Sequence, residues 1–264
     1  MNEKVILVRG AGDMATGAIH KLHRAGFKVV ATEIEKPLAV RRPVCLSEVV
    51  YEGYMKVEDM EGVLVKDLEG IHNSWANNQV PVIIDKDLEI LEYLKPDIIV
   101  DAILAKKNLG TKREMCDKII ALGPGFTAGD DVDIVIETNR GHDLARIYFQ
   151  GSTSADTGIP GDICGLTSER VFYAPCDGII KNNFKICDYV EKGNVIATVN
   201  DMPIIAEISG FLRGLIRDKY YVKSGLKLGD IEPRIDTDCY TITDKARAIG
   251  GSVLEAALIL LNRN

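Results

Sequence analysis

Short apolar runs alternate with helical stripes along the first half of the chain. Aliphatic, mostly β-branched runs, each bounded by turn or helix signals, occur at residues 5–8, 27–32, 62–65, 80–84, 97–100, 119–122 and 134–136. Such runs are typical of parallel strands that are buried on both faces. A helical stripe from Thr16 to Ala25 ends at Gly26, and Asp85 to Leu94 is a second, shorter helix candidate. The pattern predicts an α/β fold with a Rossmann-like parallel sheet, in which Pro81 indicates an edge strand or a strand start.

The second half of the chain contains an internal repeat. Ala-x-x-x-Gly followed by Val-x-x-Gly-x-x-aliphatic occurs twice, so that Ala174, Gly178, Val190, Gly193 and Ile196 recur as Ala206, Gly210, Val222, Gly225 and Leu228. Two similar strand-turn-strand units must pack on each other to bury their apolar faces. The repeat predicts a small, all-β, quasi-twofold barrel from about Val171 to Arg234.

This part of the chain resembles the biotinyl and lipoyl carrier fold, a flattened barrel-sandwich of two four-stranded halves. In that family the modified lysine sits in the hairpin that joins the halves, which here is roughly Asn200 to Pro203 and contains no lysine. The resemblance therefore implies a binding, docking or spacer module rather than a carrier of a biotin or lipoyl group.

A helix is expected to close the chain. Thr243 is its expected N-cap, Asp244 lies in its first turn and Val253 to Leu261 forms an apolar stripe, while Gly250 and Gly251 weaken the prediction of one continuous helix. We expect three parts: a Rossmann-like nucleotide- or cofactor-binding domain at 1–165, the barrel-sandwich at 170–234, and a C-terminal helical segment at 235–264.

Composition narrows the class of protein. The 264 residues carry 39 acidic and 32 basic side chains, and the net charge of −7 argues against a surface built to bind nucleic acid or anionic lipid. No run approaches the roughly 20 apolar residues that cross a bilayer, and the chain enters a strand pattern without a signal peptide. We expect a cytoplasmic protein that binds neither nucleic acid nor membrane and that can form a homo-oligomer.

A glycine-rich turn follows the first predicted strand. Its residues Gly10-Ala11-Gly12-Asp13-Met14-Ala15 have the G-x-G-x-x-G/A spacing of dinucleotide-binding turns. Gly10 would allow a tight turn, Gly12 would let a pyrophosphate approach the backbone, and Ala15 would let the helix pack closely on the strand. Glu33 ends the second strand, where an acid that binds the ribose of NAD is expected. The turn predicts NAD or another phosphate-bearing cofactor; a turn that serves packing alone is the alternative.

Further candidates lie beside other predicted strands. Asp101 follows the run 97–100, at the strand end where ligands of open α/β sheets gather. Lys106 and Lys107 could hold a bound anion or could only increase solubility. Arg41 and Arg42 could reach a phosphate or could form a basic turn before a proline.

The middle of the chain has the densest group of candidate residues. Gly123 and Gly125 belong to a loop whose glycines indicate unusual backbone angles or close approach to a ligand. The run 134–136 then leads into Glu137, and Arg140 and His142 lie in the polar turn beyond it. One interpretation is a pocket in which loop amides and Arg140 hold an anion while an acid or His142 handles a proton or a metal. The other is a pair of solvated surface turns.

Cysteines and histidines form no recognisable metal pattern. The six cysteines lack C-x-x-C spacing, so neither a disulfide framework nor a structural zinc site is indicated. His20 and His23 could share a metal on the first helix, but no third ligand is near them in the sequence. Cys45 is either a reactive thiol able to carry sulfur or selenium or an inert, partly buried side chain. No metal site is predicted.

Several motifs together resemble a known family. Leu122-Gly-Pro-Gly-Phe-Thr-Ala-Gly-Asp and Ile136-Glu-Thr-Asn-Arg-Gly-His142, with the nearby Arg146, are similar to the Rossmann part of the XdhC/CoxI accessory proteins of molybdenum hydroxylases. With Arg9-Gly-Ala-Gly-Asp-Met14, Val40-Arg-Arg-Pro and the closing Lys245 to Glu255, the whole chain resembles the YqeB type. XdhC proteins carry a separate domain before the Rossmann part, and this chain shows no equivalent.

That resemblance implies an accessory protein of a selenium-dependent molybdenum hydroxylase, which binds molybdenum cofactor and helps in its sulfuration or delivery. The implied partner is the hydroxylase or its maturation machinery. The residues alone leave two other interpretations open. One is an NAD-dependent oxidoreductase with Asp101, Glu137 or His142 as catalytic candidates. The other is a non-catalytic scaffold whose bound NAD controls association with another protein.

Overall fold

The computed structural model describes residues 3–263, which form two compact units. The first unit contains the chain up to Pro37, Val44–Asp156 and the chain from Ile242 onward, and the second contains Leu38–Pro43 and Thr157–Thr241. Neither unit is therefore continuous in the sequence. The closing helix belongs to the first unit, and a short segment from the first half of the chain belongs to the second.

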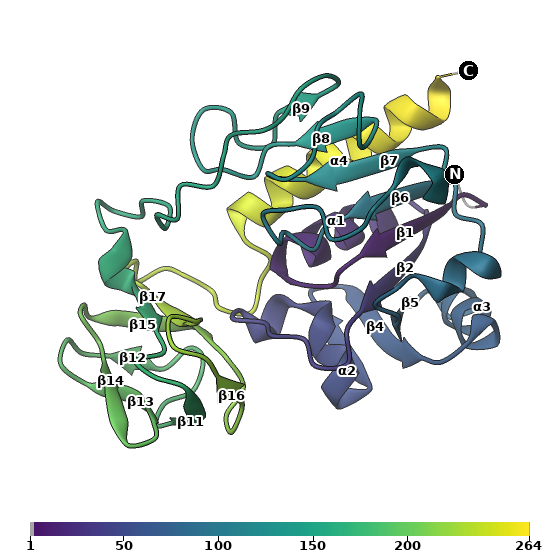
Figure 1. The fold of residues 1–264 in the computed structure, drawn as a ribbon. Helices are drawn as coiled ribbons and strands as arrows, with labels where there is room; N and C mark the ends of the chain where they lie inside the picture. The colour runs from purple at the N-terminus through teal and green to yellow at the C-terminus, as the bar shows by residue number, and fades with distance from the viewer. Residues whose placement is uncertain (1–2, 264) are drawn as a thin grey trace. The chain divides into compact units, whose positions relative to one another are not determined.

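A nine-stranded sheet forms the centre of the first unit (Figure 1). Its strands are β1 (Val5–Arg9), β2 (Lys28–Glu33), β3 (Tyr54–Val57), β4 (Met60–Val65), β5 (Val80–Ile84), β6 (Ile98–Asp101), β7 (Ile119–Leu122), β8 (Ile134–Ile136) and β9 (Ile147–Tyr148). Their order is β3-β4-β5-β2-β1-β6-β7-β8-β9. The strands from β4 to β8 are parallel, whereas β3 and β9 run antiparallel to their neighbours at the two edges.

The prediction of a Rossmann-like parallel sheet is therefore wrong: the sheet is mixed. Both antiparallel edges arise because a short connection returns the chain directly beside the preceding strand, at 58–59 and at 137–146. Beyond β6, the crossovers at 102–118 and 123–133 contain no α-helix. Pro81 is the second residue of β5, an interior strand, and it precedes the ladder with β2, which begins at Val82.

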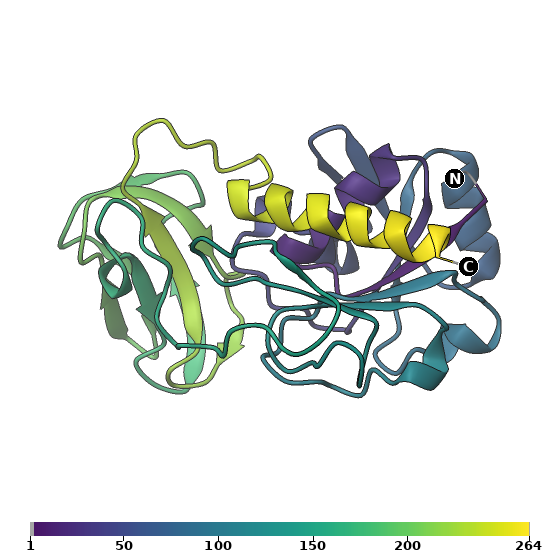
Figure 2. The same ribbon diagram turned by 90° about the horizontal axis from the view of Figure 1, so that it is seen from above.

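Four α-helices complete the first unit as described. They are α1 (Asp13–Arg24), α2 (Val49–Glu52), α3 (Leu68–Ala76) and α4 (Asp244–Asn262). Helices α1 and α4 lie side by side on one face of the sheet, and α4 also packs on β7 and β8 (Figure 2). Ile71 of α3 belongs to the apolar cluster on the opposite face. The helix predicted at 85–94 is wrong, because only a 3-10 turn at Glu89–Glu92 forms there.

Glycines allow the close packing of α1 on α4. A Cβ atom at Gly250 would collide with the carbonyl oxygen of Gly17, and a Cβ atom at Gly17 would lie 2.5 Å from the carbonyl oxygen of Ala246. Gly251, the next residue, has open space in front of it. The helix is continuous through both glycines, and Thr243 caps it by accepting a hydrogen bond from the Ala246 amide. Gly250 is therefore a contact position rather than a break.

The second unit consists of two four-stranded antiparallel sheets, β10-β17-β15-β12 and β14-β13-β11-β16. Its strands are β10 (Val171–Tyr173), β11 (Gly178–Asn182), β12 (Tyr189–Val190), β13 (Val195–Val199), β14 (Met202–Ile205), β15 (Gly210–Leu215), β16 (Tyr221–Val222) and β17 (Lys227–Glu232). The repeat pairs across its two copies, since Gly178 faces Val222 and Val190 faces Gly210. The predicted fold class is corrected here too: the unit has two separate sheets, not a carrier-type barrel.

The remaining described segments are loops and 3-10 turns. Further 3-10 turns occur at Arg42–Val44, Leu46–Glu48, Arg113–Met115 and Ser168–Arg170. Between residues 3 and 263, no helix combines the length and the apolar character needed to cross a membrane.

Candidate functional site

The carboxyl-terminal ends of the parallel strands carry most of the residues that the sequence analysis selected. At the end of β1, Gly10 has a φ of 97° and donates its amide to the Thr32 carbonyl oxygen. Gly12 caps α1 without a side chain, and no atom would touch a Cβ placed there. Asp13 begins the helix, and Met14 and Ala15 are buried. The tight turn that the sequence predicts is thus present, with open space at Gly12.

Glu33, the expected ribose ligand, contacts this turn itself. Its Oε2 accepts a hydrogen bond from the Ala11 amide at 3.0 Å, and its Oε1 accepts one from the Ile34 amide at 2.9 Å. Burial raises the pKa of Glu33, and the two amides offset only part of that effect. The carboxylate therefore braces the glycine turn against the end of β2.

Asp101 lies at the end of β6 and is 2% exposed. Its Oδ2 accepts a hydrogen bond from the Thr111 hydroxyl at 2.5 Å and lies 3.4 Å from Nη1 of Arg9, while its Oδ1 accepts one from the Ile103 amide at 3.2 Å. Arg9 also donates to the Thr111 hydroxyl oxygen and to the Leu109 carbonyl oxygen. Asp101 thus ties the loop after β6 to β1, and its oxygens already have protein partners.

Glu137 has a similar position after β8. It is 1% exposed, and its carboxylate accepts hydrogen bonds from the amides of Thr138, Asn139 and Ser154 at 2.7, 2.7 and 2.8 Å. Burial alone would raise the pKa of Glu137, but the amides of Asn139, Ser154 and Thr138 outweigh it and lower the pKa. A carboxylate held ionised by three amides is a poor proton acceptor, so the geometry favours a loop-fixing role.

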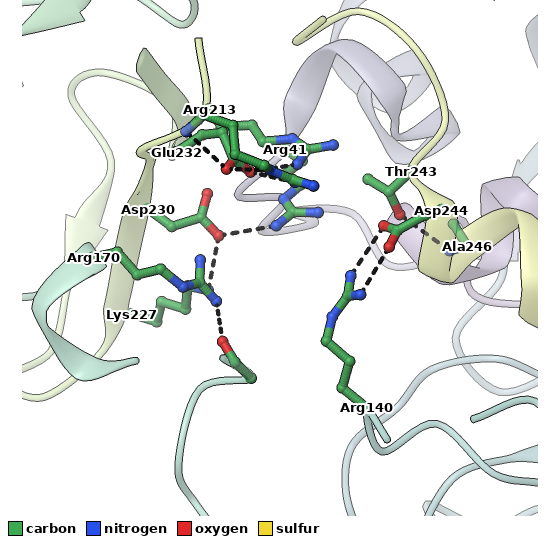
Figure 3. Close-up of polar contacts among 12 residues, drawn as sticks. Arg41, Arg140, Arg170, Arg213, Lys227, Asp230, Glu232, Thr243, Asp244 and Ala246 are labelled. Carbon is green, nitrogen blue, oxygen red and sulfur yellow. Dashed lines mark hydrogen bonds and ion pairs between the residues drawn. The ribbon is translucent and has the colours of Figure 1, made fainter. Parts of the chain in front are cut away.

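The remaining candidates of the middle region do not converge on one pocket. Arg140 forms two hydrogen bonds, of 2.8 and 3.0 Å, with the Asp244 carboxylate at the start of α4 (Figure 3). His142 is exposed. A Cβ atom at Gly123 would lie 2.6 Å from the Thr138 hydroxyl oxygen, and one at Gly125 would lie 2.5 Å from the Lys107 backbone. These glycines are explained by loops that pack on each other.

Three further expectations concern residues elsewhere. Arg41 and Arg42 belong to the second unit, where Arg41 donates to Asp230 and Arg42 donates to the Leu215 carbonyl oxygen. Lys106 forms an ion pair of 2.7 Å with Asp156. Cys45 is only 1% exposed.

A cavity that the sequence did not predict lies at the carboxyl ends of β4 and β5. Its volume is about 560 Å³. Its apolar lining comes from residues that end β5 or follow it and from the start of α3: Leu68, Ile83, Ile84, Ile90 and Tyr93. Ile84 is 42% exposed and Tyr93 is 69% exposed, which is unusual for large apolar side chains that lie together.

Four acidic residues also line this cavity. They are Asp67, Glu69, Asp85 and Glu89, and Lys66 is the cation that lines it with them. Asp67 caps α3 through the Gly70 amide, and Asp85 accepts hydrogen bonds from the amides of Glu89 and Ile90. The 3-10 turn that forms in place of the predicted helix is thus what shapes one wall. Its sequence signal was Asp85, a residue that caps a turn as readily as it starts a helix.

The second unit buries two acids in a different way. Asp230 of β17 lies 3.2 Å from Nη2 of Arg41 and 3.3 Å from Nζ of Lys227 (Figure 3). Burial alone would raise the pKa of Asp230, but Arg41, Lys227 and Arg170 outweigh it and hold the pKa far below its usual range. Two residues along the strand, Glu232 pairs with Arg213 at 2.8 Å and with Arg234 at 2.7 Å.

Comparisons with known proteins give a relative of uncharacterised function. No protein-family model matches the chain. The protein YqeB of Escherichia coli (strain K12) is 44% identical over 261 residues, which is 98% of this chain and 48% of the relative. The chain is similar to YqeB along nearly its whole length. It spans about half the length of that curated relative, which is itself called uncharacterised.

The solved structures that match the chain are far less similar to it in sequence than YqeB is. A product-bound ectoine utilization protein EutE (DoeB) from Ruegeria pomeroyi has a TM-score of 0.28 and 11% identity, covering 88% of this chain and 86% of that one. A succinylglutamate desuccinylase/aspartoacylase from Rhodobacter sphaeroides has a TM-score of 0.28 and 13% identity, covering 89% and 86%. TM-scores this low assign neither a fold nor an activity to this chain.

These findings correct the functional expectations. The matching solved structures are ectoine utilization, aspartoacylase and desuccinylase proteins, and no family model or curated relative connects the chain to molybdenum hydroxylase maturation or to NAD-dependent oxidation. The expected maturation role, and the alternatives of an NAD-dependent enzyme or an NAD-sensing scaffold, find no support in these comparisons and are withdrawn. The relation to XdhC/CoxI proteins has no matching family model behind it. Binding of NAD or molybdenum cofactor, the expected partners and a homo-oligomer stay predictions.

Proposed function

We propose that this protein binds a small molecule with a flat apolar ring and a positively charged end, in the cavity beyond β4 and β5. The observation that carries this proposal is the lining of that cavity, which combines large apolar side chains with four carboxylates. Its volume of about 560 Å³ falls within the range of about 300–1,000 Å³ that is usual for small-molecule sites.

The apolar lining of the cavity suits a planar ring because some of its side chains are partly exposed to solvent. Covering Ile84 and Tyr93 with a ring would remove apolar surface from water, at about 25 cal/mol for each Å². A planar ring also stacks on the Tyr93 side chain, a contact worth about 0.5–1.5 kcal/mol beyond the buried area.

The charged lining of the cavity suits a cation because it contains four acidic residues and one lysine. Asp67 and Asp85 already accept backbone hydrogen bonds, whereas Glu69 and Glu89 are exposed. Lys66 offsets one of these charges. An ammonium group is attracted to such a lining, and a carboxylate of the same size is repelled.

The position supports the proposal as well. Ligands of open α/β sheets bind beyond the carboxyl ends of the parallel strands. β5 is the neighbour of β2, and Ile84 is paired with Glu33, which in turn contacts Ala11 of the glycine turn. A longer ligand could therefore extend from the cavity toward Gly12.

Three compounds with the same ring test the charge preference. Tryptamine, indole and indole-3-acetate share an indole ring but carry a positive, a neutral and a negative group. We expect affinity to fall in that order when each is titrated and followed by ligand-observed NMR, and the order to weaken at high salt. Equal affinity for all three, or the reverse order, would contradict the proposal.

Two variants test whether the ligand binds in this cavity. We expect Tyr93→Ala and Ile84→Ser each to weaken tryptamine binding by roughly fivefold, the size of effect that loss of about 1 kcal/mol of contact gives. Tyr54→Ala is the matched control, because Tyr54 is a half-exposed tyrosine of β3 that does not line the cavity. Unchanged binding in the first two variants would move the site elsewhere.

A further inference from the structure

Three side chains of the kinds that bind metal ions meet near the amino end of β4, away from the cavity. His20 comes from the second half of α1, and Glu58 and Asp59 form the turn between β3 and β4. Nε2 of His20 lies 2.6 Å from Oδ1 of Asp59 and 3.5 Å from Oε2 of Glu58. One ligand atom from each residue lies within 4.8 Å of the others. The turn precedes β4, so the group is at the amino end of the strand whose carboxyl end borders the cavity.

The charges of this group are unbalanced. Two carboxylates approach the same imidazole nitrogen, which carries at most one proton and so donates one full hydrogen bond. Arg24 lies 3.5 Å from the other oxygen of Asp59, which leaves Glu58 beside His20. A divalent cation placed among the three ligand atoms would give both carboxylates and the imidazole a partner.

The protein holds two of these side chains in place. Glu58 accepts a hydrogen bond from the Ile242 amide through Oε1, at 2.9 Å, so its other oxygen is turned toward His20. Hydrogen bonds of this kind orient the ligands of metal sites. His20 is 2% exposed, and its Nδ1 has no hydrogen-bond partner among residues 3–263.

The backbone of the turn gives a second indication. Glu58 has a φ of 53°, in the left-handed region, at the first position of a two-residue hairpin turn. Glycine is favoured at such a position because a side chain there costs conformational energy. A glutamate that occupies it with its carboxylate directed at a buried histidine indicates a use for that carboxylate.

We propose that His20, Glu58 and Asp59 bind a divalent transition-metal ion of the zinc class. An imidazole nitrogen with two carboxylates suits Zn²⁺ or Co²⁺ better than Mg²⁺ or Ca²⁺, which prefer oxygen ligands alone. The ion would join α1 to the β3–β4 hairpin and, through Glu58, to the residue that precedes the cap of α4. Its role would be to stabilise the first unit.

Cobalt is the probe, because its visible absorption reports the ligands that surround it. The whole chain is stripped with a chelator and titrated with Co²⁺, and Zn²⁺ is then added as a competitor. We expect a saturable visible band at one Co²⁺ per chain, its loss on addition of Zn²⁺, and a rise in the thermal midpoint with either ion, because a ligand that binds only the folded state stabilises it.

Matched variants separate this site from general metal binding. His20→Gln and Asp59→Asn should each weaken Co²⁺ binding by tenfold or more. Glu61→Gln removes an acid from the same hairpin that is outside the group and pairs with Lys56, and it should bind Co²⁺ as the unchanged protein does. Circular dichroism checks that every variant is folded.

Two outcomes would overturn the proposal. One is the absence of saturable Co²⁺ binding by the unchanged chain, which would leave a hydrogen bond between His20 and Asp59 as the explanation of the contact. The other is Co²⁺ binding by a folded His20→Gln protein with unchanged affinity. Neither outcome affects the ligand titrations at the cavity, which involve other residues.

Discussion

Glu137 of the first unit is buried with different partners from Asp230 and Glu232 of the second unit. In the first unit, Glu137 is fully satisfied by backbone amides, all from residues 138, 139 and 154. In the second, Asp230 and Glu232 are satisfied by side-chain cations, and Arg41 reaches Asp230 from the segment 38–43. An acid bound by amides fixes the loops that carry it, whereas an acid bound by cations connects segments that are far apart in the sequence. The difference makes each unit sensitive to a different perturbation.

The largest effect is expected from Asp230→Ala. The substitution leaves Arg41 and Lys227 facing each other without the buried carboxylate that they share. Removing one partner of a buried ion pair costs about 3–5 kcal/mol of folding stability. Hydrogen exchange measured by mass spectrometry should show the loss in peptides of β15 and β17, at a given urea concentration.

A second measurement on Asp230→Ala tests whether the loss of stability is confined to the second unit. Trp75 is the only tryptophan of the chain and donates its indole N–H to the Val29 carbonyl oxygen, so its fluorescence reports on the first unit. Glu191→Ala, which removes an exposed acid of the second unit, is the control. A stability loss no larger than that of the control would show that the ion pair is not what holds this sheet together.

Glu137→Ala is expected to have the next largest effect, this time on the first unit. It removes the acceptor of three amides, and a buried donor left without a partner costs about 1–3 kcal/mol. Glu137→Gln keeps one acceptor oxygen and should lose less. The measurement is urea unfolding followed by Trp75 fluorescence.

A neighbouring ion pair is the control for this prediction. Asp143→Ala breaks an exposed contact with Arg146, which contributes at most about 1 kcal/mol. If Glu137→Ala and Asp143→Ala unfold at the same urea concentration, Glu137 does not fix its loop, and its earlier status as a catalytic candidate becomes the better explanation of its burial.

The sequence predicts the elements of both units better than their arrangement. The β-branched runs locate the inner strands to within about two residues, and Gly178 and Gly210, which the internal repeat pairs, both begin strands, β11 and β15. Strand direction at the edges is not visible in such runs, because β3 and β9 are set by short returns of the chain. Gly250 reads as a helix breaker until α1 is known to lie against it.

The candidate site could be predicted only in part, because contacts between distant segments are not visible in the sequence. Residue type and position select Glu33, Asp101 and Glu137 as site candidates at strand ends, but the sequence does not show that amides and a hydroxyl of the chain already contact their oxygens. The cavity depends on Tyr93 and Leu68, which lie on separate elements. His20 meets Glu58 and Asp59 only because the hairpin packs beside α1.

The smallest effect, and the sharpest test of the comparison, is the pH dependence of stability. The cations lower the pKa of Asp230 from its ordinary value of 3.8, so its stabilising contribution is complete above that value and is lost as the pH falls. Burial raises the pKa of Glu33 from 4.5, so the folded first unit favours the protonated acid and loses stability as the pH rises through the raised value.

The two variants Asp230→Asn and Glu33→Gln should therefore give opposite slopes. Relative to the unchanged protein, Asp230→Asn should become less stable as the pH rises from 3 to 7, because the ionised carboxylate is then what the variant lacks. Glu33→Gln should become relatively more stable over the same range, because it no longer pays for ionising a buried acid. Urea unfolding at several pH values measures both, and only the slope matters, since the amide of glutamine changes the contact with Ala11 at every pH. Parallel slopes would mean that the two units do not stabilise their buried acids differently.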